Sequence, residues 1–146
     1  MDSITLPQVA ERLYARKLPF SLDPEYNWIT INFPAEQFWI YFQSTKDDNS
    51  LRVFTSTLLD VKGSVYICKI LAKMFEVQEK FWILRFGHKK GKVDCYGLLS
   101  SLQQIDWVIG DLNCLLVAMP TLKVVQATGA EPGQQSPVDS LLDDLA

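Results

Sequence analysis

Residues 101–120 read SLQQIDWVIGDLNCLLVAMP. Ser101 and Gln104 have the spacing of a capping box, in which two side chains bond the free backbone N–H groups at the start of a helix. Pro120 is expected to end that helix, because proline lacks the N–H group that the helix ladder needs. Between them, apolar residues recur at the period of one helix face: Ile105, Val108, Ile109, Leu112, Leu115, Leu116 and Met119. The stretch therefore predicts a long helix that braces the core.

Two shorter helices are predicted upstream. Thr5 and Gln8 repeat the capping-box spacing, and a helix that starts there stops before Pro19. Its basic side chains are expected in solvent: Arg12, Arg16 and Lys17. After residue 64 the apolar period is again that of a helix, about three turns long. Its apolar face comprises Ile67, Ile70, Leu71, Met74 and Phe75.

Strand patterns fill the spaces between these helices. Three consecutive strands are predicted at 26–33, 37–44 and 51–59, where apolar residues alternate with others or β-formers dominate. Segments 80–87 and 92–99 flank the turn HKKG and predict a β-hairpin. A last extended segment is expected at 121–127. Because the connections are too short for parallel crossovers, the order α-β-β-β-α-β-β-α indicates an α+β domain with an antiparallel sheet and helices mainly on one face.

Composition divides the chain into a folding body and a tail. Of the 146 residues, 48% are hydrophobic and 12% aromatic, which is typical of a chain that buries a core. Residues 1–127 are expected to form a single domain, and residues 128–146 a disordered linker with a short acidic amphipathic motif. The last nineteen residues contain four acidic residues and no Lys or Arg, so the tail carries −4 and residues 1–127 carry +1, which together give the net charge of −3.

This element order, with aromatic residues in the strands and a long last helix, resembles the YbjN-type domain and the type III secretion chaperone fold. The resemblance covers roughly residues 4–119 and is one of topology, without a diagnostic motif. It implies a small, often dimeric module that holds or regulates other proteins. It brings no active-site residues to this sequence.

The cysteines and the lengths of the apolar runs indicate the cellular compartment of the protein. Cys68, Cys95 and Cys114 are an odd number without a CxxC pair, so neither a disulfide framework nor a zinc site is expected. No apolar run is seen that approaches the 18 to 20 or so residues of a membrane span, and the charged first twenty residues do not fit a signal peptide. These features favour a soluble protein of the cytoplasm.

No catalytic or cofactor motif is recognised. His88, the only histidine, is expected in a lysine-rich turn, which disfavours a histidine-based triad. Neither GxGxxG nor a P-loop is present. Asp106 and Asp111 are five residues apart on the last helix, so they should diverge into solvent and not converge on a metal. The sequence therefore predicts a non-enzymatic protein with no metal and no cofactor.

A strand that is apolar on both faces predicts an interface. In QFWIYFQ (37–43), Phe38, Ile40 and Phe42 point to one face while Trp39 and Tyr41 point to the other. Helices on one face would leave Trp39 and Tyr41 uncovered, with Trp82 of the next apolar run beside them. We expect this face to bind protein, as a homodimer or in a stable hetero-complex. Cover by a helix or by 121–127 within the monomer is the alternative.

The hairpin turn supports a second hypothesis. Basic side chains gather at 85–92: Arg85, His88, Lys89, Lys90 and Lys92. With Phe86 and Tyr96 nearby, such a hairpin can bind nucleic acid or a nucleotide, since lysines neutralise phosphates and aromatic rings stack on bases. A solvated turn, or a docking site for an acidic protein segment, explains the same residues.

The chain ends in SPVDSLLDDLA (136–146), which has the marks of a docking helix. Ser136 fits an N-cap and Pro137 the first helical position. The apolar residues Val138, Leu141, Leu142 and Leu145 fall on one helix face, with Asp143 and Asp144 on the other. A helix this short is marginal alone in water, so it should form when its leucines enter a groove. We expect the tail to recruit a separate protein, and the whole chain to act as an accessory, adaptor or chaperone-like factor.

Overall fold

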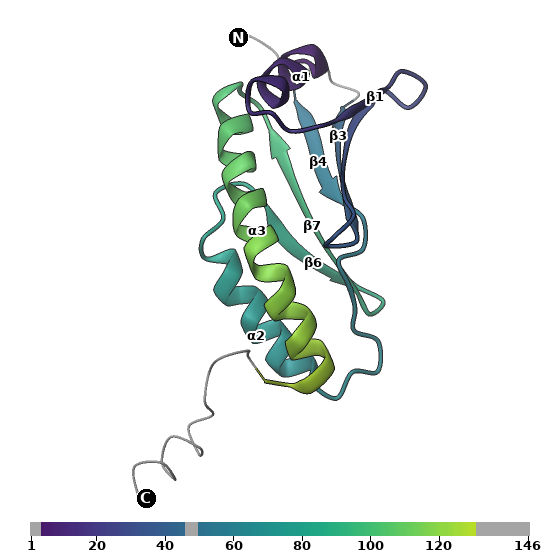
Figure 1. The fold of residues 1–146 in the computed structure, drawn as a ribbon, viewed down its shortest axis with the longest axis vertical. Helices are drawn as coiled ribbons and strands as arrows, with labels where there is room; N and C mark the ends of the chain where they lie inside the picture. Colours follow the sequence, from purple (N-terminus) through teal and green to yellow (C-terminus); the bar gives the residue numbers. More distant parts are fainter. Residues whose placement is uncertain (1–3, 46–49, 131–146) are drawn as a thin grey trace, which may run out of the picture.

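One antiparallel sheet of seven strands and three helices make up the part of the chain that the computed structural model describes, residues 4–45 and 50–130. The helices are α1 (Leu6–Ala15), α2 (Ile67–Gln78) and α3 (Gln103–Thr128). Figure 1 shows α2 and α3 side by side against one face of the sheet, while α1 crosses its end. The α+β class predicted from the sequence is confirmed.

Strand β7 holds the sheet together. The seven strands are β1 (Ser21–Asp23), β2 (Trp28–Phe33), β3 (Phe38–Ser44), β4 (Leu51–Thr55), β5 (Leu59–Asp60), β6 (Arg85–Lys89) and β7 (Lys92–Leu99). Strands β1 to β4 form a meander that continues into β7, and β7 also pairs with β5 and β6. Because β5 and β6 both pair with Lys92 and Val93, they lie on opposite sides of β7. Every pairing is antiparallel.

The core lies between the sheet and the helices. On β3, Phe38, Ile40 and Phe42 are buried while Trp39 is exposed, which confirms the predicted alternation. From α3, the predicted apolar stripe reaches the same core through Ile105, Val108, Ile109, Leu112, Leu115 and Met119. At the start of α1, the capping box is also confirmed, since Thr5 and Gln8 bond each other's backbone N–H groups.

Helix α3 corrects two predictions. Pro120 does not end it, and residues 121–127, expected as an extended segment, continue the helix. Leu122 and Val125 on this continuation are buried, and their burial offsets the hydrogen bond that an exposed proline removes. The helix ends at Gly129, whose φ of 73° is the left-handed conformation that glycine adopts without strain.

The length of α3 also corrects the expectation about apolar runs. Among the described residues it is the one helix that is long and apolar enough to cross a membrane by length and composition. In this structure its apolar stripe packs on the sheet and on α2, so the same residues serve as a core helix.

The strands differ from prediction in three places. Segment 51–59 divides into β4 and β5, which pair with successive parts of β7. The short edge strand β1 has no counterpart among the predicted strands. Residues 81–84, expected to begin the hairpin, are not in a strand, and β6 starts at Arg85. The hairpin turn is Lys90–Gly91, where both residues have positive φ, as a two-residue type I′ turn requires.

Candidate protein-binding face

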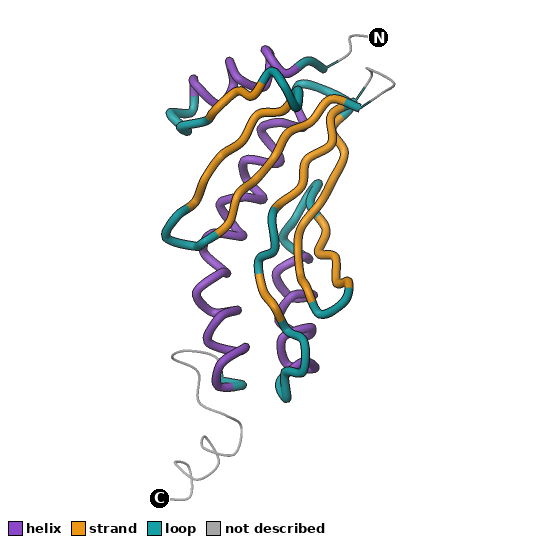
Figure 2. The backbone as a smooth tube through the Cα atoms, turned by 90° about the vertical axis from the view of Figure 1, so that its right-hand side faces the viewer, coloured by secondary structure: helices purple, strands orange, loops and turns teal. Residues whose placement is uncertain are grey.

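The sheet has one face without a helix. Figure 2 looks onto this face, with the helices behind the strands. In a pleated sheet every second side chain of a strand points to this face. Here several of these side chains are large and apolar and are exposed or half-buried, whereas a face turned to solvent usually carries polar residues. We call this surface the open face; its apolar members are Trp28, Trp39, Tyr41, Phe54, Tyr96 and Leu98.

Aromatic rings cross the open face in a continuous row. Tyr26 stacks on Trp28 with ring centroids 4.9 Å apart, and Trp28 contacts Tyr41 at 5.0 Å. Tyr41 in turn stacks on Phe54 at 5.0 Å. The register makes this row, since Tyr41 lies opposite Phe54 and Phe54 opposite Tyr96 on the neighbouring strands. Such pairs stabilise the sheet and restrict the positions of the rings.

Two arginines border the row at its β4–β7 end. The Arg52 guanidinium lies 5.1 Å from the centroid of the Phe54 ring, a cation–π distance, and donates to Gln43 Oε1 at 3.0 Å. Arg85 lies across β7 from it. Together they border a hollow of about 560 Å³, lined by Arg52, Phe54, Ile83, Arg85, Tyr96, Gly97 and Leu98. The hollow combines an apolar floor with a positive rim.

The predicted face residues divide into two groups. Trp39 is 43% exposed and Tyr41 half-buried, and both lie on the open face as expected. Trp82 does not, so the prediction that placed it there is wrong. It precedes β6, and its ring lies 5.8 Å from that of Trp107 on α3. The next residue, Ile83, lines the hollow instead.

The predicted basic cluster is also divided, because alternate residues of a strand point to opposite faces. Arg85 and Lys89 belong to the open face, where Lys89 lies opposite Lys92 in the register. His88 borders a small cavity against α2 on the other side of the sheet. Lys90 is exposed in the turn. The structure therefore does not gather the five side chains at one site.

An unforeseen carboxylate organises residues 82–84. Asp111 is 1% exposed, and its two oxygens accept hydrogen bonds from the backbone N–H groups of Trp82, Ile83 and Leu84 at 2.7 to 2.9 Å. The expectation that Asp111 is solvated is wrong. A signal was present in the sequence, since position 111 falls within the buried stripe between Val108 and Leu115.

The other aspartate of α3 joins α3 to α1. Asp106 accepts from Arg12 at 2.7 Å and from Arg16 at 3.1 Å, so these two arginines are not simply solvated as predicted. The carboxylate lies in the first turn of α3, where the helix dipole favours negative charge. The pairs are partly exposed and should each contribute little to stability.

All three cysteines are free thiols. Cys95 is buried, and this burial raises the pKa of its thiol well above its usual range, with the carboxylates of Asp94 and Asp111 raising that pKa further. Among the described residues no group of three or more His, Cys, Asp or Glu side chains is placed to hold a metal ion.

Thiol reactivity should follow this burial. Because the thiolate is the nucleophile that displaces iodide from iodoacetamide, we expect the exposed Cys68 of the native protein to react at least about a hundredfold faster than the buried Cys95. Peptide mass spectrometry over a time course measures both rates, and unfolding in guanidinium chloride should bring them together. Equal rates in the native protein would contradict the burial of Cys95.

The residues of the predicted tail motif, Val138, Leu141, Leu142, Asp143, Asp144 and Leu145, lie outside the described residues.

Comparison with known proteins bears on the fold. No family model matches the sequence, and no curated protein matches it. A chain of the solved structure "Crystal Structure of the ExsC-ExsE Complex" is 21% identical, with a TM-score of 0.50 over 90% of this chain and 100% of that chain. A chain of "Structure of the HopA1-SchA Chaperone-Effector Complex" is 15% identical, with a TM-score of 0.48 over 80% of this chain and 95% of that chain. The first likeness shows a fold shared with a chain of that complex, while the resemblances to the type III secretion chaperone fold and to the YbjN-type domain stay predictions.

Proposed function

We propose that this protein is a non-enzymatic binding module, a chaperone-like or adaptor factor that holds a segment of another protein on its open face. The observation that carries the proposal is the row of aromatic rings from Tyr26 to Phe54 on the sheet face without a helix. Each large aromatic ring buries on the order of 150 to 250 Å² when covered. A patch of several such rings exceeds what monomeric proteins usually leave exposed without a function.

The composition of the face favours a polypeptide partner. The rings offer a flat apolar surface, and Arg52 and Arg85 add two cations at its rim. Apolar anchors surrounded by polar groups are typical of interfaces that bind protein. An apolar segment with acidic residues matches both features, because the carboxylates would pair with the arginines while the apolar side chains cover the rings.

The comparison agrees with a partner of different sequence. The similar chain of known structure comes from a complex of two proteins, ExsC and ExsE. A symmetric homodimer through the open face is the other arrangement expected from the sequence. In a two-fold interface the same surface meets itself, so an axis through the hollow would bring Arg52 and Arg85 of both copies toward one another. That repulsion disfavours a dimer centred on the hollow.

We also propose that the C-terminal motif takes part in capturing the partner. Leu141, Leu142 and Leu145 would serve as its apolar anchors and Asp143 and Asp144 would direct it toward a basic surface. The two contacts would act together, since a tethered second contact raises the effective concentration of its binding site.

The double variant Trp39→Ala/Tyr96→Ala tests the open face. Both residues are about half exposed and neither belongs to the buried core, so the variant should fold normally yet lose at least about tenfold in partner affinity. Partners captured by the tagged full-length protein from its native cells are identified, and the affinity of each for the wild type and the variant is then measured by calorimetry. Trp82→Ala removes an exposed tryptophan away from the open face and is the matched control.

The outcome of this test separates three cases. Equal affinity of the double variant and the wild type would refute the open face as the binding surface. Light scattering that shows a wild-type dimer and a monomeric double variant would replace the hetero-complex with a homodimer. Nucleic acid is the alternative partner, since Arg85, Lys89 and Lys92 share the open face with Tyr96. Its binding would weaken steeply with salt, whereas the apolar protein interface should not.

A further inference from the structure

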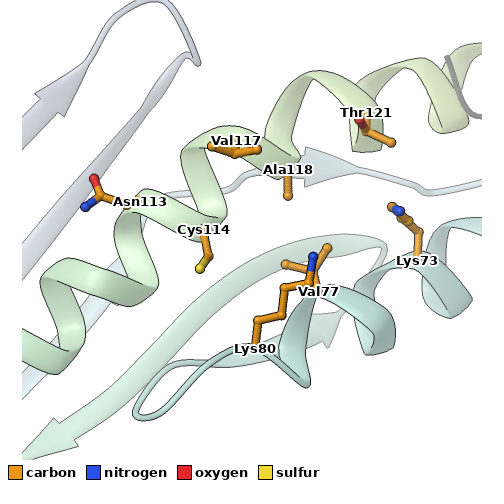
Figure 3. A pocket seen from close by; sticks show the side chains of 8 residues that line it. All are labelled: Lys73, Val77, Lys80, Asn113, Cys114, Val117, Ala118 and Thr121. Carbon is orange, nitrogen blue, oxygen red and sulfur yellow. The ribbon is translucent and has the colours of Figure 1, made fainter. Parts of the chain in front are cut away.

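Helices α2 and α3 leave a groove between them on their exposed surface. Figure 3 shows its lining: Lys73 and Val77 from α2 and Lys80 from the turn after it, with Asn113, Cys114, Val117, Ala118 and Thr121 from α3. The groove has a volume of about 370 Å³. It is separate from the open face, which lies on the other side of the sheet.

The chemistry of the groove is that of a docking site for an acidic amphipathic helix. Its floor is apolar, formed by Val77, Cys114 and Ala118, and Val117 beside it is 80% exposed. Lys73 of α2, which also pairs with Glu76 at 3.5 Å, and Lys80, which follows the end of α2, stand on the α2 side of the groove. Apolar side chains in the groove with carboxylates beside the two lysines would satisfy both features.

The chain itself contains such a segment. Val138, Leu141, Leu142 and Leu145 share one helix face, and Asp139, Asp143 and Asp144 supply three negative charges with no Lys or Arg nearby in the sequence. As a helix, residues 138–145 would span about 12 Å, and the groove from Asn113 to Thr121 has the same length by the same rise per residue.

The point where the chain leaves α3 allows the segment to reach the groove. Lys69 of the first turn of α2 donates to the carbonyl oxygen of Gly129 at 2.9 Å, so the end of α3 lies beside the start of α2. The near end of the groove, at Thr121, is eight residues or about 12 Å back along α3. The seven residues 131–137 span up to about 25 Å when extended, which is enough for residue 138 to enter there.

We infer that residues 138–145 dock as a short helix in the α2–α3 groove of their own chain, antiparallel to α3. Entry at the Thr121 end places Asp139 near Lys73 and Asp143 near Lys80, because these two carboxylates fall on the same flank of the helix. The apolar anchors then cover Cys114 and Val117. While the tail is docked, its leucines are covered and cannot contact other proteins. They become available only when a protein that competes for the groove displaces the tail.

The reactivity of the native Cys114 thiol measures whether the tail is docked, so no probe has to be introduced into the protein. In the full-length protein, Leu142→Ala/Leu145→Ala should raise the iodoacetamide reaction rate at Cys114 about threefold or more, because a mostly docked tail protects the thiol for most of the time. Cys68, which is exposed and does not line the groove, should react at the same rate in both proteins. Equal Cys114 rates in wild type and variant would overturn the proposal.

Charge reversal provides an independent arm. Lys80→Glu should expose Cys114 in the same way, and adding Asp143→Lys to that variant should restore its protection. Lys89→Glu makes the same charge change on the distant hairpin and should leave Cys114 protected. A tenfold dilution distinguishes the occupant: protection within one chain persists, whereas protection that fades on dilution would assign the tail to a second copy and overturn docking in its own chain.

Discussion

Replacing Asp111 with Ala should lower the free energy of unfolding by about 3 to 5 kcal/mol, because it leaves three backbone N–H groups without their acceptor. Hydrogen bonds to charged groups contribute more than neutral ones, and the N–H group of Leu84 is itself buried. Urea denaturation followed by tryptophan fluorescence measures the loss.

Two further variants define what Asp111 contributes. Asp111→Asn keeps the shape but presents an NH₂ group toward one of the backbone N–H donors, so it should also destabilise, by less than Ala. Asp106→Ala is the matched control on the same helix. Its partners Arg12 and Arg16 are partly exposed, and its loss should cost about 1 kcal/mol or less. Equal effects of the two alanine variants would mean that the hydrogen bonds to residues 82–84 do not stabilise the fold.

Periodicity predicts those elements whose residues fold according to their local pattern. The alternation in QFWIYFQ placed Phe38, Ile40 and Phe42 in the core, and the spacing from Ile105 to Met119 defined the buried side of α3. In both cases one side of a regular element is buried, so the pattern of apolar residues and the geometry of the backbone carry the same information.

Elements set by tertiary contacts could not be predicted in this way. Residues 81–84 are as apolar as a buried strand, yet three of their backbone N–H groups donate hydrogen bonds to Asp111 and not to a neighbouring strand. These bonds join positions 27 to 29 apart in the sequence. Pro120 is a strong local stop signal, but burial of Leu122 and Val125 carries the helix through it. In each case a tertiary contact outweighs the local secondary-structure propensity, and the spacing of residues in the sequence does not reveal that contact.

The candidate site shows the same division. Trp39 and Tyr41 were assigned to the open face because they alternate with buried residues on one strand. The row of rings was not foreseen, since Trp28, Tyr41 and Phe54 come from three strands and meet only through the register. Trp82 was assigned to the face from an apolar run alone, and that assignment was wrong.

Leu112→Ala should be the second large effect, a loss of about 2 to 5 kcal/mol in the free energy of unfolding. Leu112 is 2% exposed in the middle of α3, where the core lies between the helix and the sheet. Truncation removes three buried carbon atoms and leaves a cavity that a regular helix cannot close by moving, because Asp111 and Leu115 hold it on either side.

Leu98→Ala is the matched control, the same chemical change at a residue that is 61% exposed on β7. Little apolar surface is buried there, so its cost should stay within about 0.5 kcal/mol. Both variants are measured by urea denaturation, and the slope of free energy against urea should be unchanged if the transition remains two-state. A loss below about 0.5 kcal/mol for Leu112→Ala would contradict its place in the core, since a cavity of that size cannot form there without cost.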